Sequence, residues 1–178
     1  DYPGELDIVI AIGPSKDRTH EVAQSIAEAN GHVHVVDNPS GKTPSGLNAA
    51  IAFGDSDIVV RIDGHAMVPS DYVRTGVLTL QATGADNVGG VMAAEGTTDF
   101  ERTVARAMTS KFGVGGASFH VGGEAGPALT VYLGCFQRSA LRRVGGYDES
   151  MQRAQDWEMN LRIRQTGGVV WFTPDMRV

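Results

Sequence analysis

The hydrophobic positions of this chain fall into short apolar runs that alternate with segments of helical periodicity. Residues 6–12 read Leu-Asp-Ile-Val-Ile-Ala-Ile, a length and composition typical of a strand buried on both faces. In the segment that follows, Val22 and Ile26 recur at helical spacing, and Asn30 closes the predicted helix. The beginning of the chain therefore predicts a strand followed directly by a helix.

The same alternation continues to the end of the chain. Further strands are predicted at residues 32–36, 57–62, 87–94, 129–134 and 169–172, and further helices from Pro44 onward and at about 70–83, 98–111, 138–144 and 155–166. Residues 113–127 are so rich in glycine that we expect a mobile loop there. Strands that alternate with helices indicate an α/β domain with a largely parallel central sheet and helices on both faces. Such sheets bind ligands beyond the carboxyl ends of their strands.

Composition and charge exclude several classes of function. The chain has 178 residues, which suits one domain with a substantial core, and its formal net charge is −6. Phosphate backbones demand a basic face, so we expect no nucleic-acid partner. The single cysteine, Cys135, excludes an internal disulfide and a multi-cysteine metal site, and it favours a cytoplasmic setting. No apolar run reaches the roughly 18 residues that a membrane-spanning helix requires.

Candidate chemistry begins where the third predicted strand ends. Residues 59–62 are Val-Val-Arg-Ile, and Asp63, Gly64 and His65 follow directly. An Asp-Gly pair is ordinary in a turn, so a turn capped by the acid is one interpretation of this stretch. The alternative is a cation site, because a carboxylate at a strand end can hold Mg²⁺ or Mn²⁺ while phosphate oxygens complete the coordination shell.

Four stretches of the chain, taken in order, resemble one known family. They are SKDRT at 15–19, NPSGKTPSGLNAAI at 38–51, VVRIDGHA at 59–66 and VGGYDESMQRAQDWEMNLRIRQTG at 144–167. Together they are similar to the family 2 glycosyltransferases, and within that family to bacterial exopolysaccharide enzymes of the succinoglycan type. The resemblance implies the GT-A nucleotide-sugar-binding fold, with a mostly parallel central sheet, in a single domain over residues 1–178.

The resemblance also implies that this domain is clipped at both ends. Family members begin with an apolar strand and a helix ahead of a Tyr-Pro pair, which is seen here as Tyr2-Pro3, so the first strand of the fold is expected to be lacking. The chain stops at Val178, ahead of the region where processive members carry a Gln-x-x-Arg-Trp motif. Contact with the inner face of a cell membrane is therefore expected only through segments outside these residues.

The donor side of the site is implied by three further matches. Asp63 begins the stretch that stands where the family carries its Asp-x-Asp motif, which faces the donor diphosphate through a divalent cation, Mn²⁺ or Mg²⁺. His65 replaces the third-position acid, and its imidazole suits Mn²⁺ better than Mg²⁺ or could hydrogen-bond the phosphate directly. Asp17 matches a later family acid, more often structural than ligand-binding, and Lys42 could reach a phosphate or stay in solvent. Ile12 occupies the slot of the acid that usually holds uracil or ribose, so a donor other than a UDP-sugar remains open.

The acceptor side is implied by Gln155-Asp156-Trp157-Glu158, which resembles the family's Glu-Asp motif at the start of a helix. By position Asp156 matches the catalytic base, and a glutamine replaces the usual Glu before it. Glu158 lies two residues on, so it faces a different side of the helix. An alternative that needs no catalysis is that these acids complement the positive end of the helix.

These implications predict an inverting glycosyltransferase that moves a sugar from a nucleotide-sugar donor, such as a UDP-sugar, to a glycan or lipid-linked acceptor in bacterial polysaccharide synthesis. Asp63, with His65, would hold the cation on the donor diphosphate, and Asp156 would deprotonate the acceptor hydroxyl. A non-catalytic relative that binds a sugar nucleotide or a glycan is the first alternative. A nucleotidyltransferase is the second, although it would need a Gly-rich, basic loop after its first strand, which this segment does not contain.

Overall fold

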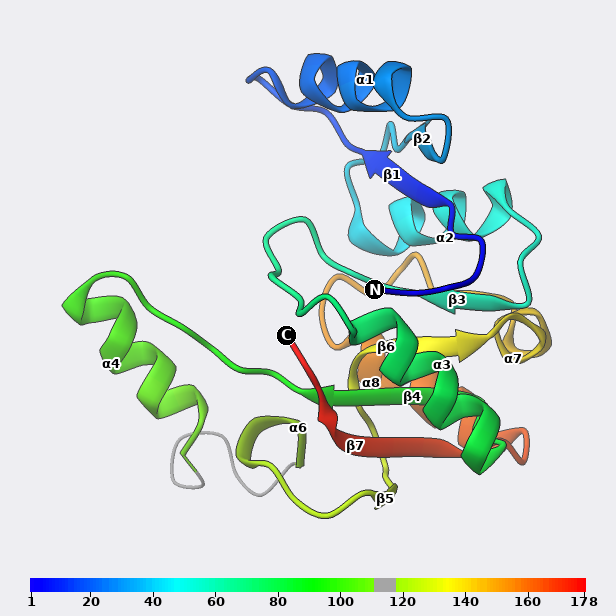
Figure 1. The fold of residues 1–178 in the computed structure, drawn as a ribbon, viewed down its shortest axis with the longest axis vertical. Helices are drawn as coiled ribbons and strands as arrows, with labels where there is room; N and C mark the ends of the chain where they lie inside the picture. Colours follow the sequence, from blue (N-terminus) through cyan, green and yellow to red (C-terminus); the bar gives the residue numbers. More distant parts are fainter. Residues whose placement is uncertain (111–117) are drawn as a thin grey trace.

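The computed structural model describes residues 1–110 and 118–178, and the strands within them form two separate sheets (Figure 1). The smaller sheet pairs β1 (Ile8–Ile12) with β2 (Val33–Asp37) in parallel. The larger, five-stranded sheet has the order β3-β6-β4-β7-β5 among the described residues. Its strands are β3 (Ile58–Val60), β4 (Asn87–Val91), β5 (Gly126–Pro127), β6 (Tyr132–Gln137) and β7 (Val170–Arg177).

The first two helices follow the predicted pattern. α1 (Thr19–Ala29) ends just before its C-cap residue Asn30, and α2 (Thr43–Phe53) carries Pro44 in its first turn, where the missing N–H costs little. Both helices pack against β1 and β2. The smaller sheet and these helices therefore form a β-α-β-α unit, as the alternation of apolar runs and helical periodicity predicts.

The larger sheet is mixed, so the prediction of a mostly parallel sheet is wrong. β6 runs antiparallel to both β3 and β4, whereas β4 and β7 are parallel and β5 is antiparallel to β7. The reason lies in the connection from β4 to β6. Its helix α4 (Asp99–Met108) has no buried residue and lies away from the sheet in Figure 1. Because α4 does not carry the chain back across a sheet face, as a parallel crossover requires, β6 enters from the opposite end.

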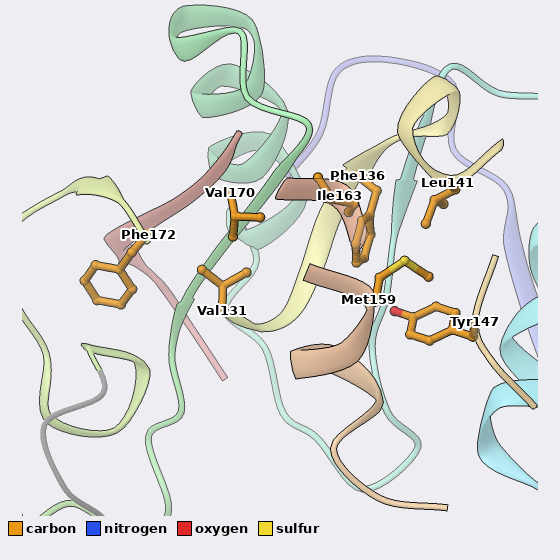
Figure 2. Close-up of a cluster of buried hydrophobic side chains, with 8 residues drawn as sticks. All are labelled: Val131, Phe136, Leu141, Tyr147, Met159, Ile163, Val170 and Phe172. Atoms are coloured by element: carbon orange, nitrogen blue, oxygen red, sulfur yellow. The ribbon is translucent and has the colours of Figure 1, made fainter. Parts of the chain in front are cut away.

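Helices cover both faces of the larger sheet, as predicted. They are α3 (Tyr72–Thr83), α7 (Arg138–Val144) and α8 (Gln155–Gln165). Cys135 of β6 lies in the buried cluster under α3, whereas the next residue, Phe136, lies in the cluster under α7 and α8 (Figure 2). Successive strand residues point to opposite faces, so one apolar strand serves both cores. Burial raises the pKa of the Cys135 thiol to about 12, in keeping with a packing role.

A cavity of about 210 Å³ lies between β1 and β3. Apolar side chains from both strands and from the helices α2 and α3 line it, including Val9, Leu47, Val60 and Val77. Within the described part of the chain, β1 pairs with β2 alone and β3 pairs with β6 alone. β1 and β3 are therefore not paired with each other.

The second half of the chain departs from the prediction mainly around the glycine-rich segment. Residues 113–117 of the predicted mobile loop lie outside the described residues, and beyond them the chain forms α6 (Ser118–Val121) and β5. The strand predicted at 129–134 is β6, which begins at Tyr132. In the residues that the structure describes, we find no helix with both the length and the apolar character needed to span a bilayer.

Candidate active site

Asp63 lies just beyond β3, which is an outer strand of the larger sheet. Its backbone carbonyl accepts a hydrogen bond from the N–H of Ala66 at 2.8 Å, so these residues form a turn with an exposed His65. The turn uses only the backbone of Asp63. Its carboxylate takes no part in the turn, so the turn and a separate role for the side chain are compatible.

Arg61 joins Asp63 to the second predicted acid, Asp156. The Arg61 side chain is only 7% exposed. Its Nε donates to Oδ1 of Asp63 at 2.8 Å, and its Nη2 donates to Oδ2 of Asp63 at 3.2 Å. Its Nη1 donates to Oδ1 of Asp156, which stands 95 positions further along the chain. One buried guanidinium thus holds both acids, and we call Arg61, Asp63 and Asp156 the acid–arginine cluster.

Two residues with positive φ shape the surroundings of Asp156. Ala154, which precedes α8, has φ of 59°, and Leu133 of β6 has φ of 55°. The N–H of Leu133 donates to Oδ2 of Asp156 at 3.3 Å. Positive φ is uncommon in residues other than glycine, and such strain clusters at functional sites. Both carboxylate oxygens of Asp156 consequently have a hydrogen-bond donor.

One turn after Asp156, Asn160 anchors α8 in the core. The side chain of Asn160 accepts from Asn87 Nδ2 at 2.7 Å and donates to Thr130 Oγ1 at 3.0 Å. Asn87 belongs to β4, the middle strand of the larger sheet. Residues four apart share one face of a helix, so this buried amide pair sets the orientation in which Asp156 meets the sheet.

An aromatic ring supports Arg61 from another direction. The guanidinium carbon of Arg61 lies 5.6 Å from the centroid of the Tyr147 ring. Asn48 of α2 holds the Tyr147 backbone, since its Nδ2 donates to the carbonyl at 2.9 Å and its Oδ1 accepts from the N–H at 2.8 Å. Gly146 permits this approach, because a Cβ there would lie 2.7 Å from Oδ1 of Asn48. The unit around the smaller sheet thereby contributes to the position of Arg61.

In the acid–arginine cluster, burial and ion pairing shift the pKa values of Arg61 and Asp156 in opposite directions. Burial disfavours the charged form of Arg61, but the nearby carboxylates of Asp156 and Asp63 outweigh it, so the pKa of Arg61 lies above its ordinary value. Burial raises the pKa of Asp156 above its ordinary value, and Arg61 together with the N–H of Leu133 opposes that rise. A carboxylate with a raised pKa is a better proton acceptor than an ordinary one, which suits Asp156 to general-base chemistry.

Residues 2–145 of this chain match the family described as glycosyl transferase family 2. The chain belongs to that family. The succinoglycan biosynthesis protein ExoA of Rhizobium meliloti (strain 1021) is 35% identical over 173 residues, which make up 96% of this chain and 52% of that protein. The chain therefore spans about half the length of this curated relative.

Solved structures share the fold of this family 2 chain at low sequence identity. TarS residues 1–349 from S. aureus, in complex with UDP, has a TM-score of 0.71 and 13% identity, over 100% of this chain and 52% of that one. GalNAc-T7 with UDP, GalNAc and Mn²⁺ has a TM-score of 0.69 and 15% identity, over 97% of this chain and 37% of that one. These likenesses confirm the α/β fold of the GT-A type.

Other residues that the family resemblance singled out lie apart from the cluster. Lys42 stands just before α2, and its Nζ approaches the backbone carbonyl of Glu149 at 3.5 Å. Glu158 forms an ion pair with Arg162 at 2.5 Å along α8 and not with Arg61, which agrees with the prediction that it faces differently from Asp156.

Asp17 is engaged at the start of α1. Its Oδ1 accepts hydrogen bonds from the hydroxyl of Ser15 and, at 2.9 Å, from the N–H of Thr19. These bonds, with that from the Thr19 hydroxyl, lower the pKa of Asp17 to about 2. The contacts are those of an acid that stabilises the beginning of a helix.

The donor set around Asp63 fits a divalent cation when a substrate supplies further ligands. Among the described residues, no group of three or more His, Cys, Asp or Glu side chains could hold a metal ion by itself. Asp63 offers a carboxylate and His65 an imidazole, a combination that suits Mn²⁺, and diphosphate oxygens would supply the remaining positions. Both oxygens of Asp63 are bonded to Arg61 in this structure.

Sequence reasoning missed Arg61, although a signal was present. A charged side chain within an apolar strand is unfavourable unless it is paired, so the arginine in Val-Val-Arg-Ile required an acidic partner. Asn48 and Asn160 carried no comparable signal. Their partners, Tyr147 and Asn87, lie 99 and 73 positions away, so only the folded chain shows their roles.

Proposed function

We propose that this domain is an inverting glycosyltransferase that transfers a sugar from a nucleotide-sugar donor to a hydroxyl of a glycan or lipid-linked acceptor. The observation that carries the proposal is the convergence of Asp63 and Asp156 on one buried arginine. The two acids come from separate elements, the end of β3 and the start of α8, and the family resemblance assigns them to the donor and acceptor sides of the site. A partly buried cluster of charged groups with a perturbed pKa marks a candidate functional site.

Asp156 is the base of the proposed reaction. A sugar hydroxyl is too weakly acidic to attack at neutral pH, so it needs a proton acceptor within hydrogen-bond reach. Asp156 takes the hydroxyl proton while the oxygen attacks the anomeric carbon from the face opposite the leaving group. The new glycosidic bond forms as the bond to the nucleoside diphosphate breaks. Arg61 and the N–H of Leu133 orient the carboxylate for this step.

Asp63 and His65 are the residues that would hold a divalent cation. When bound, such a cation supplies neutralisation of the charge that develops on the departing diphosphate. Asp63 is fixed at a strand end, whereas His65 is exposed and adaptable. Lys42, and less directly Asp17, are candidates for further contacts with the donor, because each lies in the loop after a strand of the smaller sheet.

The relatives suggest the class of donor and the setting. TarS is seen with UDP and with UDP-GlcNAc, and GalNAc-T7 with UDP, which makes a UDP-sugar the first donor to test for this chain. ExoA is a succinoglycan biosynthesis protein, which points to bacterial exopolysaccharide synthesis. In that setting the domain works in the cytoplasm, at the inner face of the cell membrane.

We expect a strand from outside residues 1–178 to occupy the cavity between β1 and β3. The N–H of Ile8 bonds towards β2, so by strand alternation the backbones of Val9 and Ala11 face the cavity. The N–H of Arg61 bonds to β6, so the backbone of Val60 faces the cavity from the other side. Two strand edges that are unpaired among the described residues and face one cavity favour an inserted strand, which would join the two sheets into one.

Transfer assays test the proposal directly. A panel of nucleotide-sugars is screened for binding to the longer parent protein, and each binder is then assayed for turnover with glycan and lipid-linked acceptors. Release of nucleoside diphosphate together with a glycosylated acceptor is expected. Binding without turnover would replace the proposal with a binding-only relative, which the occupation of both acids by Arg61 favours as the second candidate. Pyrophosphate release from a nucleoside triphosphate would indicate a nucleotidyltransferase.

A further inference from the structure

We infer that Arg61 is a positioning residue that a divalent cation displaces from Asp63 while it stays on Asp156. The inference rests on the proposed function, because it concerns the same two acids. It goes beyond that function by adding a third participant and an exchange of partners. The family motifs that mark Asp63 and Asp156 do not assign a role to Arg61.

Arg61 occupies both oxygens of the Asp63 carboxylate, through Nε at 2.8 Å and Nη2 at 3.2 Å. This side-on arrangement uses the lone pairs that a cation would need. A cation with two positive charges would also repel the guanidinium at such short range. A cation and Arg61 therefore compete for Asp63, and cation binding must loosen at least one of these two bonds.

No such competition arises at Asp156. Nη1 of Arg61 donates to Oδ1 of Asp156, and the backbone of Leu133 donates to Oδ2. The Tyr147 ring, 5.6 Å from the guanidinium carbon, limits the movement of Arg61 on the remaining side. When Arg61 leaves Asp63, it can thus remain on Asp156 and continue to hold that carboxylate in place.

Removing Arg61 should change cation binding at Asp63 and sugar transfer at Asp156 in opposite directions. Asp63 loses a competitor, so a cation should bind there more tightly. Asp156 loses the donor that orients it, so sugar transfer should slow. A residue that merely supported the fold would weaken both properties together, and this difference in sign makes the inference testable.

The test uses Arg61→Gln and Arg61→Lys in the full-length protein, with Arg138→Gln as the matched control. Arg138 is also a buried arginine, but it bonds to the backbone carbonyls of Ile51 and Ser56 and contacts neither acid of the cluster. Calorimetric binding of UDP, and of inorganic pyrophosphate as a probe without a base, is measured across a Mn²⁺ titration. Transfer kinetics and thermal melting are recorded for the same proteins.

For Arg61→Gln we expect the half-saturating Mn²⁺ concentration to fall roughly tenfold, the scale of one charge-assisted hydrogen bond. We expect kcat to fall roughly tenfold or more, with the donor KM changed by less than about threefold. Arg61→Lys keeps the charge but cannot span two carboxylates, so its Mn²⁺ requirement should stay near that of the unsubstituted protein while kcat still falls. Arg138→Gln should lower the melting temperature and leave the Mn²⁺ requirement unchanged.

An unchanged or higher Mn²⁺ requirement in Arg61→Gln would overturn the inference, as would an unchanged kcat. The same shift in Arg138→Gln would do so too, because it would reflect a general loss of stability. Failure of the unsubstituted protein to bind either probe in a Mn²⁺-dependent way would instead reject the proposed cation site, and the inference with it. The two failures are therefore distinguishable.

Discussion

Replacing Asp156 with asparagine separates the proposed base from its structural role. Asparagine keeps the shape and polarity of the side chain but lacks the basic lone pairs of a carboxylate. We expect the donor to bind nearly normally and sugar transfer to slow at least about a hundredfold, since loss of a general base typically lowers rates by about 10²–10⁴-fold. A hundredfold loss corresponds to about 2.7 kcal/mol of activation free energy.

The structural consequence of Asp156→Asn follows from its contacts. Arg61, which is 7% exposed, loses one of two charged partners, while its paired bonds to Asp63 remain. Removing one charge-assisted hydrogen bond lowers the free energy of unfolding by about 1.5–3 kcal/mol, which urea denaturation measures. The N–H of Leu133 can still bond to the amide oxygen, so the variant should fold and the rate can be compared directly.

Glu158→Gln is the matched control for this experiment. Glu158 lies on the same helix and its side chain is 21% exposed, compared with 19% for Asp156. It pairs with Arg162 one turn later and is not bonded to Arg61. Its transfer rate should stay within about threefold of the unsubstituted enzyme. Near-normal transfer by Asp156→Asn, or equal losses in the two variants, would refute the assignment of the base.

Four further outcomes are expected. A base works only when it is ionised, and burial raises the pKa of Asp156. The transfer rate should therefore begin to fall on acidification at a pH above the ordinary aspartate pKa of about 3.9. A pH–rate profile that stays flat down to about pH 4 would contradict this. Nucleoside diphosphate should bind more tightly with Mn²⁺, a gain that Asp63→Ala abolishes and His65→Ala reduces in part, and equal affinity with and without metal in the unsubstituted protein would exclude the cation site. Adding the natural upstream residues should raise the melting temperature by filling the cavity between β1 and β3, so a monomeric domain with an unchanged melting temperature would count against the inserted strand. Asn160→Leu should lower the free energy of unfolding by about 1–3 kcal/mol because it leaves Asn87 unpaired in the core, and a loss below about 0.5 kcal/mol would show that the amide pair does not anchor α8.

Candidate acids at the ends of elements could be singled out from the sequence. Asp63 follows an apolar strand and Asp156 lies in the first turn of a helix, as the sequence predicts. The family match includes Asp63 and ends at residue 145, before Asp156. Arg61 lies within an apolar strand, so the sequence signals that it needs an acidic partner but does not say which acid that is. What distinguishes it is burial beside two carboxylates, and burial depends on elements that are remote in the chain.

The direction of β6 likewise could not be predicted from local sequence features. Its apolar run and its flanking helix are local features, and they predict that a strand exists there. Whether that strand runs parallel or antiparallel depends on the path from β4, and α4 leaves the sheet instead of crossing it. The spacing of apolar residues does not depend on that path, so the mixed sheet could not be predicted from the spacing.

The sequence by itself determined where most strands and helices form, which faces are apolar, and which two acids the family resemblance singles out. These properties depend on neighbours within a few positions, where backbone geometry and side-chain spacing act directly. Only the tertiary structure decided that Arg61 meets Asp156, 95 positions away, and that β1 and β3 leave a cavity between them. Such contacts depend on how whole elements pack, because a buried charge or an unpaired strand edge finds its partner in space rather than along the chain.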